Sequence, residues 1–191
     1  SSNSQYSGYG TAKRLDGKVL YAAKHVEDGN GNSYLIGWSR KNADDLTQWG
    51  GNLVAYKLVQ KDNGDLTLAP VDAVVSAMSN RRQLATQDTH WYANASAKTY
   101  FEAFTCYETF TIRGEFSYTG TGSFGLAFAN NSRSISIDPA TGRIQLKTGN
   151  TVVAESSVQL TKNTTYSFTY VQDGSTGVFY VDGIAALTVR I

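Results

Sequence analysis

Acidic side chains are the first candidates for chemistry in this 191-residue chain, which contains sixteen Asp and Glu. Two carboxylates held roughly 5–10 Å apart can hydrolyse a glycosidic bond between them. Most of the acids occur in turn-forming stretches such as Asp44-Asp45 and Asp138-Pro139, where Asp accepts hydrogen bonds from its own backbone. Glu102, Glu108 and Glu115 fall in predicted strands, and the polar side of an alternating strand explains Glu115. We therefore predict no catalytic residue.

Histidine and cysteine are too few to predict a metal site or a nucleophile. The chain has only His25, His90 and Cys106, whereas metal sites usually need three or four ligands at recognisable spacing. No Ser/His/Asp or Cys/His set is assembled around Cys106. We predict no metal and no cofactor. We expect His25 to be a packed strand residue and Cys106 a small buried hydrophobe.

Aromatic side chains are the other candidates, because sugar rings stack on flat side chains while polar groups bind the hydroxyls. Trp38 and Trp49 have an alternative role, in which they pack a sheet against its neighbours and are therefore buried. The candidates for carbohydrate contact are Tyr21, Trp38, Trp49, Trp91 and Tyr92.

Composition indicates an all-β, turn-rich protein, with eighteen Gly, twelve Tyr and eight Phe but only two Pro. A net charge of +1 does not show the excess of basic residues that is typical of nucleic-acid-binding proteins. No apolar run approaches the length of a transmembrane helix. We therefore predict neither a nucleic-acid partner nor a membrane span.

The aromatic candidates must be positioned by strands, and the first pair is a hairpin at Lys18–Trp38. Two apolar runs, Val19–Val26 and Tyr34–Trp38, are separated by six turn-forming residues. Strand alternation places Tyr21 and His25 on one face. Neither face of the first run is clearly polar, so we expect that strand to be buried on both sides.

Two further strands, Leu53–Gln60 and Asp65–Ala69, complete a blade-like antiparallel sheet. Apolar residues at helical spacing then predict a short helix at about 71–79. From Ala97 onward, short alternating strands at roughly ten-residue spacing predict a sandwich or jelly roll. The expected fold is all-β: a blade-like sheet plus a concanavalin A-like/jelly-roll β-sandwich, with one short helix between them. The expected domains are 1–80 for the sheet with its helix, 81–96 for a linker and 97–191 for the sandwich.

Residues 18–75 resemble the last propeller blade of glycoside hydrolase family 32, the invertases, inulinases and levanases. Leu20–Lys24, Leu35–Trp38 and Trp49–Gly51 match short motifs of that blade, in the family's order and spacing. Asp65-Leu66 and Pro70-Val71 match the family's passage into its C-terminal β-sandwich. The resemblance covers roughly residues 18–75 and implies a blade followed by a sandwich.

The catalytic motifs of that family are missing from this sequence. The family carries a Trp-x-Asn-Asp-Pro-Asn, an Arg-Asp-Pro and a Glu-Cys motif, whereas here the only Asp-Pro is Asp138-Pro139 and Cys106 follows Thr105. Val19 replaces an acidic residue of the blade, and Tyr56-Lys57 replaces a Pro-Arg. A start without Met favours a processed or trimmed product. The resemblance thus implies no activity in this chain alone, and glycoside hydrolysis of fructose-containing or related glycans only within a longer protein.

Three functions remain as hypotheses. The first is a non-catalytic C-terminal region that supports an upstream propeller domain and contacts oligo- or polysaccharide. The second is a stand-alone carbohydrate-binding, lectin-like module, and the third is a self-contained glycosidase, which the missing motifs disfavour. A flat apolar patch on the blade would favour the first, and exposed aromatics beside polar groups the second. The resemblance implies a secreted, periplasmic or cell-surface protein.

Overall fold

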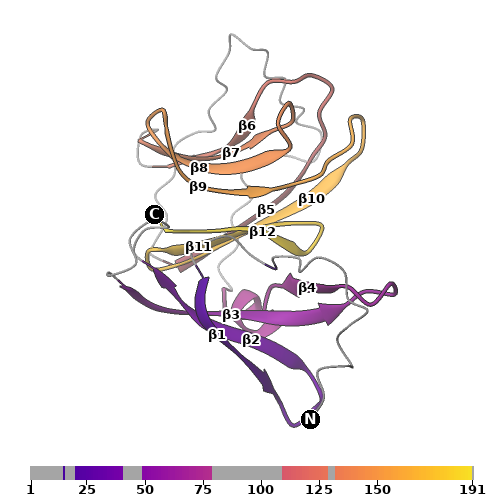
Figure 1. Ribbon diagram of the computed structural model, residues 1–191, viewed down its shortest axis with the longest axis vertical. Helices are drawn as coiled ribbons and strands as arrows, with labels where there is room; N and C mark the ends of the chain where they lie inside the picture. The colour runs from indigo at the N-terminus through magenta and orange to yellow at the C-terminus, as the bar shows by residue number, and fades with distance from the viewer. Residues whose placement is uncertain (1–14, 16–19, 41–48, 79–108, 129–131, 191) are drawn as a thin grey trace, which may run out of the picture.

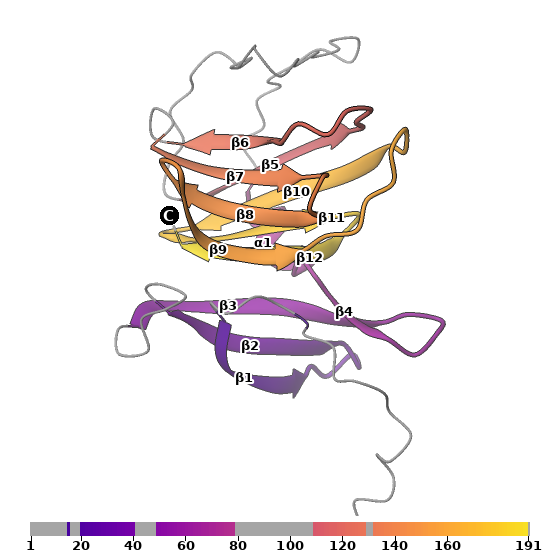
Figure 2. The same cartoon turned by 45° about the horizontal axis from the view of Figure 1, so that its top comes forward.

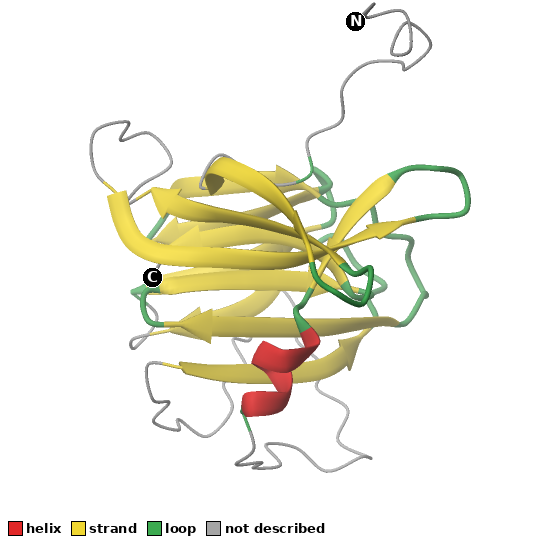
Figure 3. Ribbon diagram, turned by 90° about the horizontal axis from the view of Figure 1, so that it is seen from below, coloured by secondary structure: helices red, strands yellow, loops and turns green. Residues whose placement is uncertain are grey.

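Three antiparallel sheets of four strands each are stacked in layers, as the computed structural model shows (Figures 1 and 2). The structure describes residues 15, 20–40, 49–78, 109–128 and 132–190. One short helix accompanies the strands in these ranges (Figure 3). The predicted all-β fold, with a sheet, a short helix and a β-sandwich in that order, is confirmed.

The N-terminal sheet has the strand order β1-β2-β3-β4 and contains both predicted hairpins. The Asp28 carboxylate organises the first turn by accepting hydrogen bonds from the backbone N–H groups of Asn30 and Asn32, at 2.8 and 2.9 Å. Gly31 in the same turn has a φ of +80°, which glycine adopts without steric cost. The strands are β1 (Leu20–Glu27), β2 (Ser33–Arg40), β3 (Trp49–Gln60) and β4 (Leu66–Ala69).

A β-bulge in β1 overturns the prediction that Tyr21 and His25 share a face. Tyr21 pairs with Trp38 and Lys24 with Ile36, so two residues of β1 oppose one of β2. The extra residue shifts the alternation by one and moves every later side chain to the other face. Tyr21 and His25 therefore point to opposite faces.

The expected burial of β1 is also wrong, because β1 is an edge strand that pairs only with β2. Every residue of β1 after Leu20 is exposed. The His25 side chain is 52 % exposed, and its Nε2 lies 3.9 Å from a carboxylate oxygen of Glu27. His25 is therefore a surface residue instead of a packed one.

The predicted short helix is present as α1 (Asp72–Ala77), which follows Pro70. Asp72 in its first turn forms an ion pair with Lys57 of β3, with Nζ and Oδ2 3.4 Å apart. At its other end, the sulfur of Met78 accepts a hydrogen bond from the Thr111 hydroxyl. These contacts attach α1 to the N-terminal sheet and to the sandwich.

The sandwich is formed by a middle sheet and a distal sheet. The middle sheet has the order β12-β11-β10-β5 and the distal sheet β6-β7-β8-β9. The middle sheet comprises β5 (Thr109–Phe116), β10 (Tyr166–Asp173), β11 (Thr176–Val181) and β12 (Ile184–Arg190). The distal sheet comprises β6 (Phe124–Phe128), β7 (Arg133–Asp138), β8 (Arg143–Thr148) and β9 (Thr151–Ser157).

The core of the sandwich lies between these two sheets. Alternate residues of β7 and β8 point inward, and Ile137 and Ile144 are 1 % and 0 % exposed. They meet aromatic residues of the middle sheet, where the rings of Phe168 and Phe179 are stacked with centroids 5.7 Å apart. Alternation between a buried and a solvated face explains why sequence periodicity predicts the distal strands well.

The middle sheet is buried on its other face as well, because the N-terminal sheet packs against it. Tyr56 and Leu68 of the N-terminal sheet contact Val178 and Tyr180 of β11, and all four are at most 6 % exposed. Every residue of β11 is buried. The N-terminal sheet and the sandwich thus share a second apolar core. The predicted linker at 81–96 lies outside the described residues, and the division into two domains stays a prediction.

Candidate functional site

The N-terminal sheet turns one face away from the middle sheet, and on this outer face three apolar side chains lie in a row. Tyr21 pairs with Trp38, and Trp38 pairs with Leu53 across the next strand. Directly paired residues point to the same side of a sheet. Leu53 points outward because its neighbour Val54 lies in the core below. Tyr21, Trp38 and Leu53 are 43 %, 51 % and 66 % exposed.

Other apolar residues extend this row. Val26 of β1 lies beyond the bulge on the same face, and Val59 follows Leu53 on β3 at an even spacing. Of the nine exposed large hydrophobic side chains in the described part of the chain, five belong to this face. We call this set the outer face; its members are Tyr21, Val26, Trp38, Leu53 and Val59.

Charged residues also lie on this face: Lys24 pairs with Ile36, and Lys57 lies on β3 between Leu53 and Val59. Lys57, which pairs with Tyr34, is engaged with Asp72 of α1. Hydrogen bonds, first from the Asn32 side chain, lower the pKa of Asp28 from 3.8 to about 2. Burial, together with its hydrogen bond to Asp28, raises the pKa of Tyr34. Asp28 is therefore ionised at neutral pH and holds the turn, so it is unsuited to donate a proton.

Asp138 and Asp182 also hold turns through hydrogen bonds to the backbone. Asp138 accepts a hydrogen bond from the backbone N–H of Ala140 at 3.0 Å, and Asp182 accepts one from that of Ser167 at 2.7 Å. Glu115 is exposed on β5. Within the described ranges, no group of three or more His, Cys, Asp or Glu could hold a metal ion. His90, Glu102, Cys106 and Glu108 lie outside these ranges.

Two of the five predicted carbohydrate-contact residues are brought together by the fold. Tyr21 and Trp38 are cross-strand neighbours on the outer face, and both are exposed. Trp49 begins β3, paired with Arg40, but its side chain is outside the described part. Trp91 and Tyr92 lie outside the described residues altogether. The described part of the chain leaves Trp38 uncovered, so the alternative in which Trp38 and Trp49 pack the sheet against its neighbours stays a prediction.

Sequence reasoning missed the aliphatic members of the outer face. The run Leu53–Val59 is apolar at every position except Lys57, so both faces of β3 are apolar. A continuous apolar run predicts a strand covered on both sides. In the structure only the face carrying Val54 and Tyr56 is covered. The apolar residues that alternate with Val54 and Tyr56 in this run therefore indicated a second apolar face, which in the structure is the outer face.

Comparison with solved structures finds a protein with a similar fold. No protein-family model and no curated protein matches the sequence. The structure is similar to that of sucrose-6-phosphate hydrolase from Lactobacillus gasseri, with 20 % sequence identity and a TM-score of 0.63 over 93 % of this chain. The chain spans 38 % of the length of that hydrolase. At this identity the likeness shows a shared fold, which agrees with the sheet and sandwich that the sequence resemblance implies.

A second similar structure is the carbohydrate-binding module CBM66 from Bacillus subtilis. It shares 11 % identity over 93 % of this chain and 81 % of the module, with a TM-score of 0.37. A score this low does not establish a common fold. No helix in the described part of this chain is long and apolar enough to cross a membrane.

Proposed function

We propose that this chain is the non-catalytic C-terminal region of a glycoside-hydrolase-like protein and that its outer face supports a propeller domain. The observation that carries the proposal is the exposed apolar row formed by Tyr21, Trp38 and Leu53. Contiguous apolar surface of this kind marks interaction sites in soluble proteins.

The neighbours of Trp38 favour a protein partner over a sugar. Leu53 and Tyr21 are its cross-strand neighbours. Ile36 lies two residues along the same strand, and Lys24 pairs with Ile36. A sugar-binding site needs hydrogen-bonding groups for the hydroxyls beside its aromatic platform. A largely apolar surround instead matches the inner face of a sheet-on-sheet packing, in which two sheets lie about 10 Å apart.

The fold likeness supports a larger protein as the setting. A hydrolase of the matched architecture has more than half of its length beyond the part that this chain spans, since that part is 38 %. Catalysis and the hydrolysis of fructose-containing or related glycans are proposed for that remainder. Asp28, Asp138 and Asp182 hold turns, which fits a supporting region. We also propose a secreted, periplasmic or cell-surface location, on the sequence resemblance.

The mass of the native protein tests this proposal. An immunoblot of an extract of its source, probed with antibody against this chain, should show a species much heavier than the 20.7 kDa of these residues. Mass spectrometry of the immunoprecipitated band should then identify a propeller sequence that carries a carboxylate pair. A native species of 20.7 kDa would overturn the supporting role.

The second candidate function is a stand-alone carbohydrate-binding module, which the exposed pair of Tyr21 and Trp38 favours. Stacking of a sugar on Trp38 would change its fluorescence. Titration with soluble polysaccharides, comparing the unchanged protein with Trp38→Ala, should give a saturable change only in the former. If both respond alike, or neither does, the outer face is not a sugar platform.

A further inference from the structure

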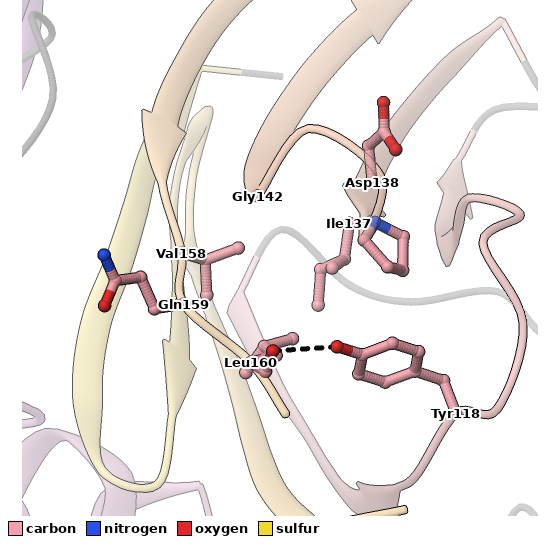
Figure 4. Close-up of a pocket in the computed structure, with 8 residues that line it drawn as sticks. Tyr118, Ile137, Asp138, Gly142, Val158, Gln159 and Leu160 are labelled. Atoms are coloured by element: carbon pink, nitrogen blue, oxygen red, sulfur yellow. Dashed lines mark hydrogen bonds between the residues drawn. The ribbon is translucent and has the colours of Figure 1, made fainter. Parts of the chain in front are cut away.

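The pocket at the edge of the sandwich offers little chemistry to a ligand (Figure 4). Its volume is about 200 Å³, and apolar side chains such as Ile137, Val158 and Leu160 line most of it. The Tyr118 hydroxyl in its lining donates a hydrogen bond to the carbonyl oxygen of Leu160 at 2.8 Å. The Asp138 carboxylate points away from it. Reactive groups outside the outer face lie instead in the turns of the N-terminal sheet.

Two hairpin turns of the N-terminal sheet carry an Asn-Gly pair on the same backbone conformation. One pair, Asn30-Gly31, lies between β1 and β2, and the other, Asn63-Gly64, lies between β3 and β4. In each turn the glycine N–H donates to the carbonyl three residues earlier, at 3.2 Å for Gly31 and 2.8 Å for Gly64. The two glycines have φ angles of +80° and +84°. Both asparagines are exposed, so the turns differ mainly in their side chains.

An Asn-Gly pair can react with itself. The backbone nitrogen of the glycine attacks the Cγ of the asparagine, a C–N bond forms, and ammonia leaves, which produces a five-membered succinimide. Water then opens this ring on either side and gives Asp or isoaspartate. Glycine favours the attack because it has no side chain to obstruct it and reaches backbone angles that other residues avoid. The reaction releases one ammonia, consumes one water and needs no further reactant.

The two asparagine side chains are held differently. In the second turn, Asn63 Oδ1 accepts the backbone N–H of Asp65 at 3.0 Å, and Asn63 Nδ2 donates to the Asp65 carboxylate at 3.1 Å. In the first turn, the Asp28 carboxylate accepts the backbone N–H groups of Asn30 and Asn32 instead. Within the described residues, the Asn30 side chain makes no hydrogen bond. The Asn30 carboxamide can therefore rotate toward the attacking nitrogen, whereas that of Asn63 must first break two hydrogen bonds.

We propose that Asn30 is a deamidation site of this protein and that Asn63 is protected from the same reaction. The two hydrogen bonds should slow the reaction at Asn63 by roughly five- to a hundredfold relative to Asn30. The product places a new carboxylate, or a backbone longer by one methylene group, beside the Asp28 that holds the turn. Either change disturbs the hairpin that carries Tyr21 and Trp38 of the outer face. The site does not depend on the supporting role and would survive the failure of that proposal.

The test is an incubation of the full chain at mildly alkaline pH, followed over time by peptide mapping with mass spectrometry. Each deamidated peptide gains the mass difference between Asp and Asn, and isoaspartate separates from Asp by its elution. Asn30 should be lost at least about fivefold faster than Asn63. Equal rates, faster loss of Asn63, or no loss of Asn30 overturns the proposal.

The same incubation in urea shows whether the folded turn causes the difference. The unfolded chain lacks the hydrogen bonds to Asp65, so the ratio of the two rates should fall to about twofold or less. A ratio that persists in urea would assign the difference to the neighbouring sequence and contradict the protection of Asn63 by the fold. This comparison needs no variant.

Two variants localise the cause. Asp65→Ala removes the carboxylate that binds Asn63 Nδ2, so the loss of Asn63 should become about fivefold faster or more while Asn30 keeps its rate. Asn30→Gln is the matched control: it should abolish the early mass change in the first hairpin and leave the rate at Asn63 unchanged. An unchanged rate at Asn63 in folded Asp65→Ala, or an early mass change that remains in Asn30→Gln, contradicts the assigned site.

Discussion

Tyr56 of β3 and Thr188 of β12 share a hydrogen bond between their hydroxyl oxygens, and both residues are 0 % exposed. They join the N-terminal sheet to the middle sheet inside an apolar core. A second such contact, between Ser39 and Thr176 hydroxyls at 3.0 Å, is also buried. Buried polar groups that are paired cost little, while a broken pair leaves a desolvated group behind. These bonds therefore fix the register of the two sheets.

Removal of the Tyr56 hydroxyl should weaken the whole fold, because the N-terminal sheet and the sandwich share this core. We expect Tyr56→Phe to lower the free energy of unfolding by about 1–2 kcal/mol in urea denaturation. Combining it with Thr188→Val should cost less than the sum of the single changes. Strict additivity would show that the two hydroxyls are not coupled. Tyr34→Phe, whose partner Asp28 lies in a surface turn, serves as control.

The two faces of the N-terminal sheet should respond differently to the same substitution. Leu68 is 1 % exposed and faces the middle sheet, while Leu53 is 66 % exposed on the outer face. Leu68→Ala should lower the free energy of unfolding by about 2–5 kcal/mol. Leu53→Ala should change it by no more than about 0.5 kcal/mol. Comparable losses in thermal or urea unfolding would mean that the outer face is covered in the isolated chain.

Polar substitution of the outer face should reduce the self-association of the isolated chain without unfolding it. The double variant Trp38→Ser and Leu53→Ser removes two of the most exposed apolar side chains. We expect weaker binding of a hydrophobic dye and less self-association in sedimentation velocity. Val152→Ser with Val153→Ser, which are exposed on the distal sheet, is the matched control. The docking role is contradicted if this control has the same effect.

In a longer protein that contains a propeller, the same outer-face variant should loosen the joint between the two parts. Limited proteolysis should then release this region at a lower protease concentration than from the unchanged protein, because an apolar interface holds it. The distal-sheet control should be cleaved as the unchanged protein is. Equal resistance of all three proteins would show that the outer face makes no contact with the rest of that protein.

Low pH should destabilise the first hairpin, because Asp28 becomes protonated. Its pKa falls from 3.8 to about 2 on folding, so the folded state binds protons less readily than the unfolded state. The stabilisation is complete above about pH 4 and is lost as the pH falls toward 2. In a pH series of melting temperatures, Asp28→Asn should flatten the slope in this window and leave the slope above pH 5 unchanged. A slope that persists in the variant would assign it to another group.

Local periodicity in the sequence predicted much of the secondary structure of this protein. Turn-forming residues predicted the first hairpin, and the predicted strands Leu53–Gln60 and Asp65–Ala69 overlap β3 and β4. The helix followed from apolar residues at helical spacing. These features arise from neighbours in sequence, whose side-chain directions depend only on backbone period and turn chemistry. The all-β class was therefore predictable.

Tertiary structure decided which faces are covered. An apolar run such as Leu53–Val59 shows that two faces are apolar, but packing against β11 covers only one of them. The bulge beside Ala22, with its φ of +50°, reversed the faces of β1 against the alternation of the sequence. A single inserted residue is invisible to a period count but moves every later side chain.

The outer face depends on such non-local placement. Sequence analysis named Tyr21 and Trp38, but only the register of three strands placed Leu53 beside them. The sequence by itself determined the strands, the turns and the missing catalytic motifs. The fold determined which face is exposed, because burial depends on residues far apart in the chain.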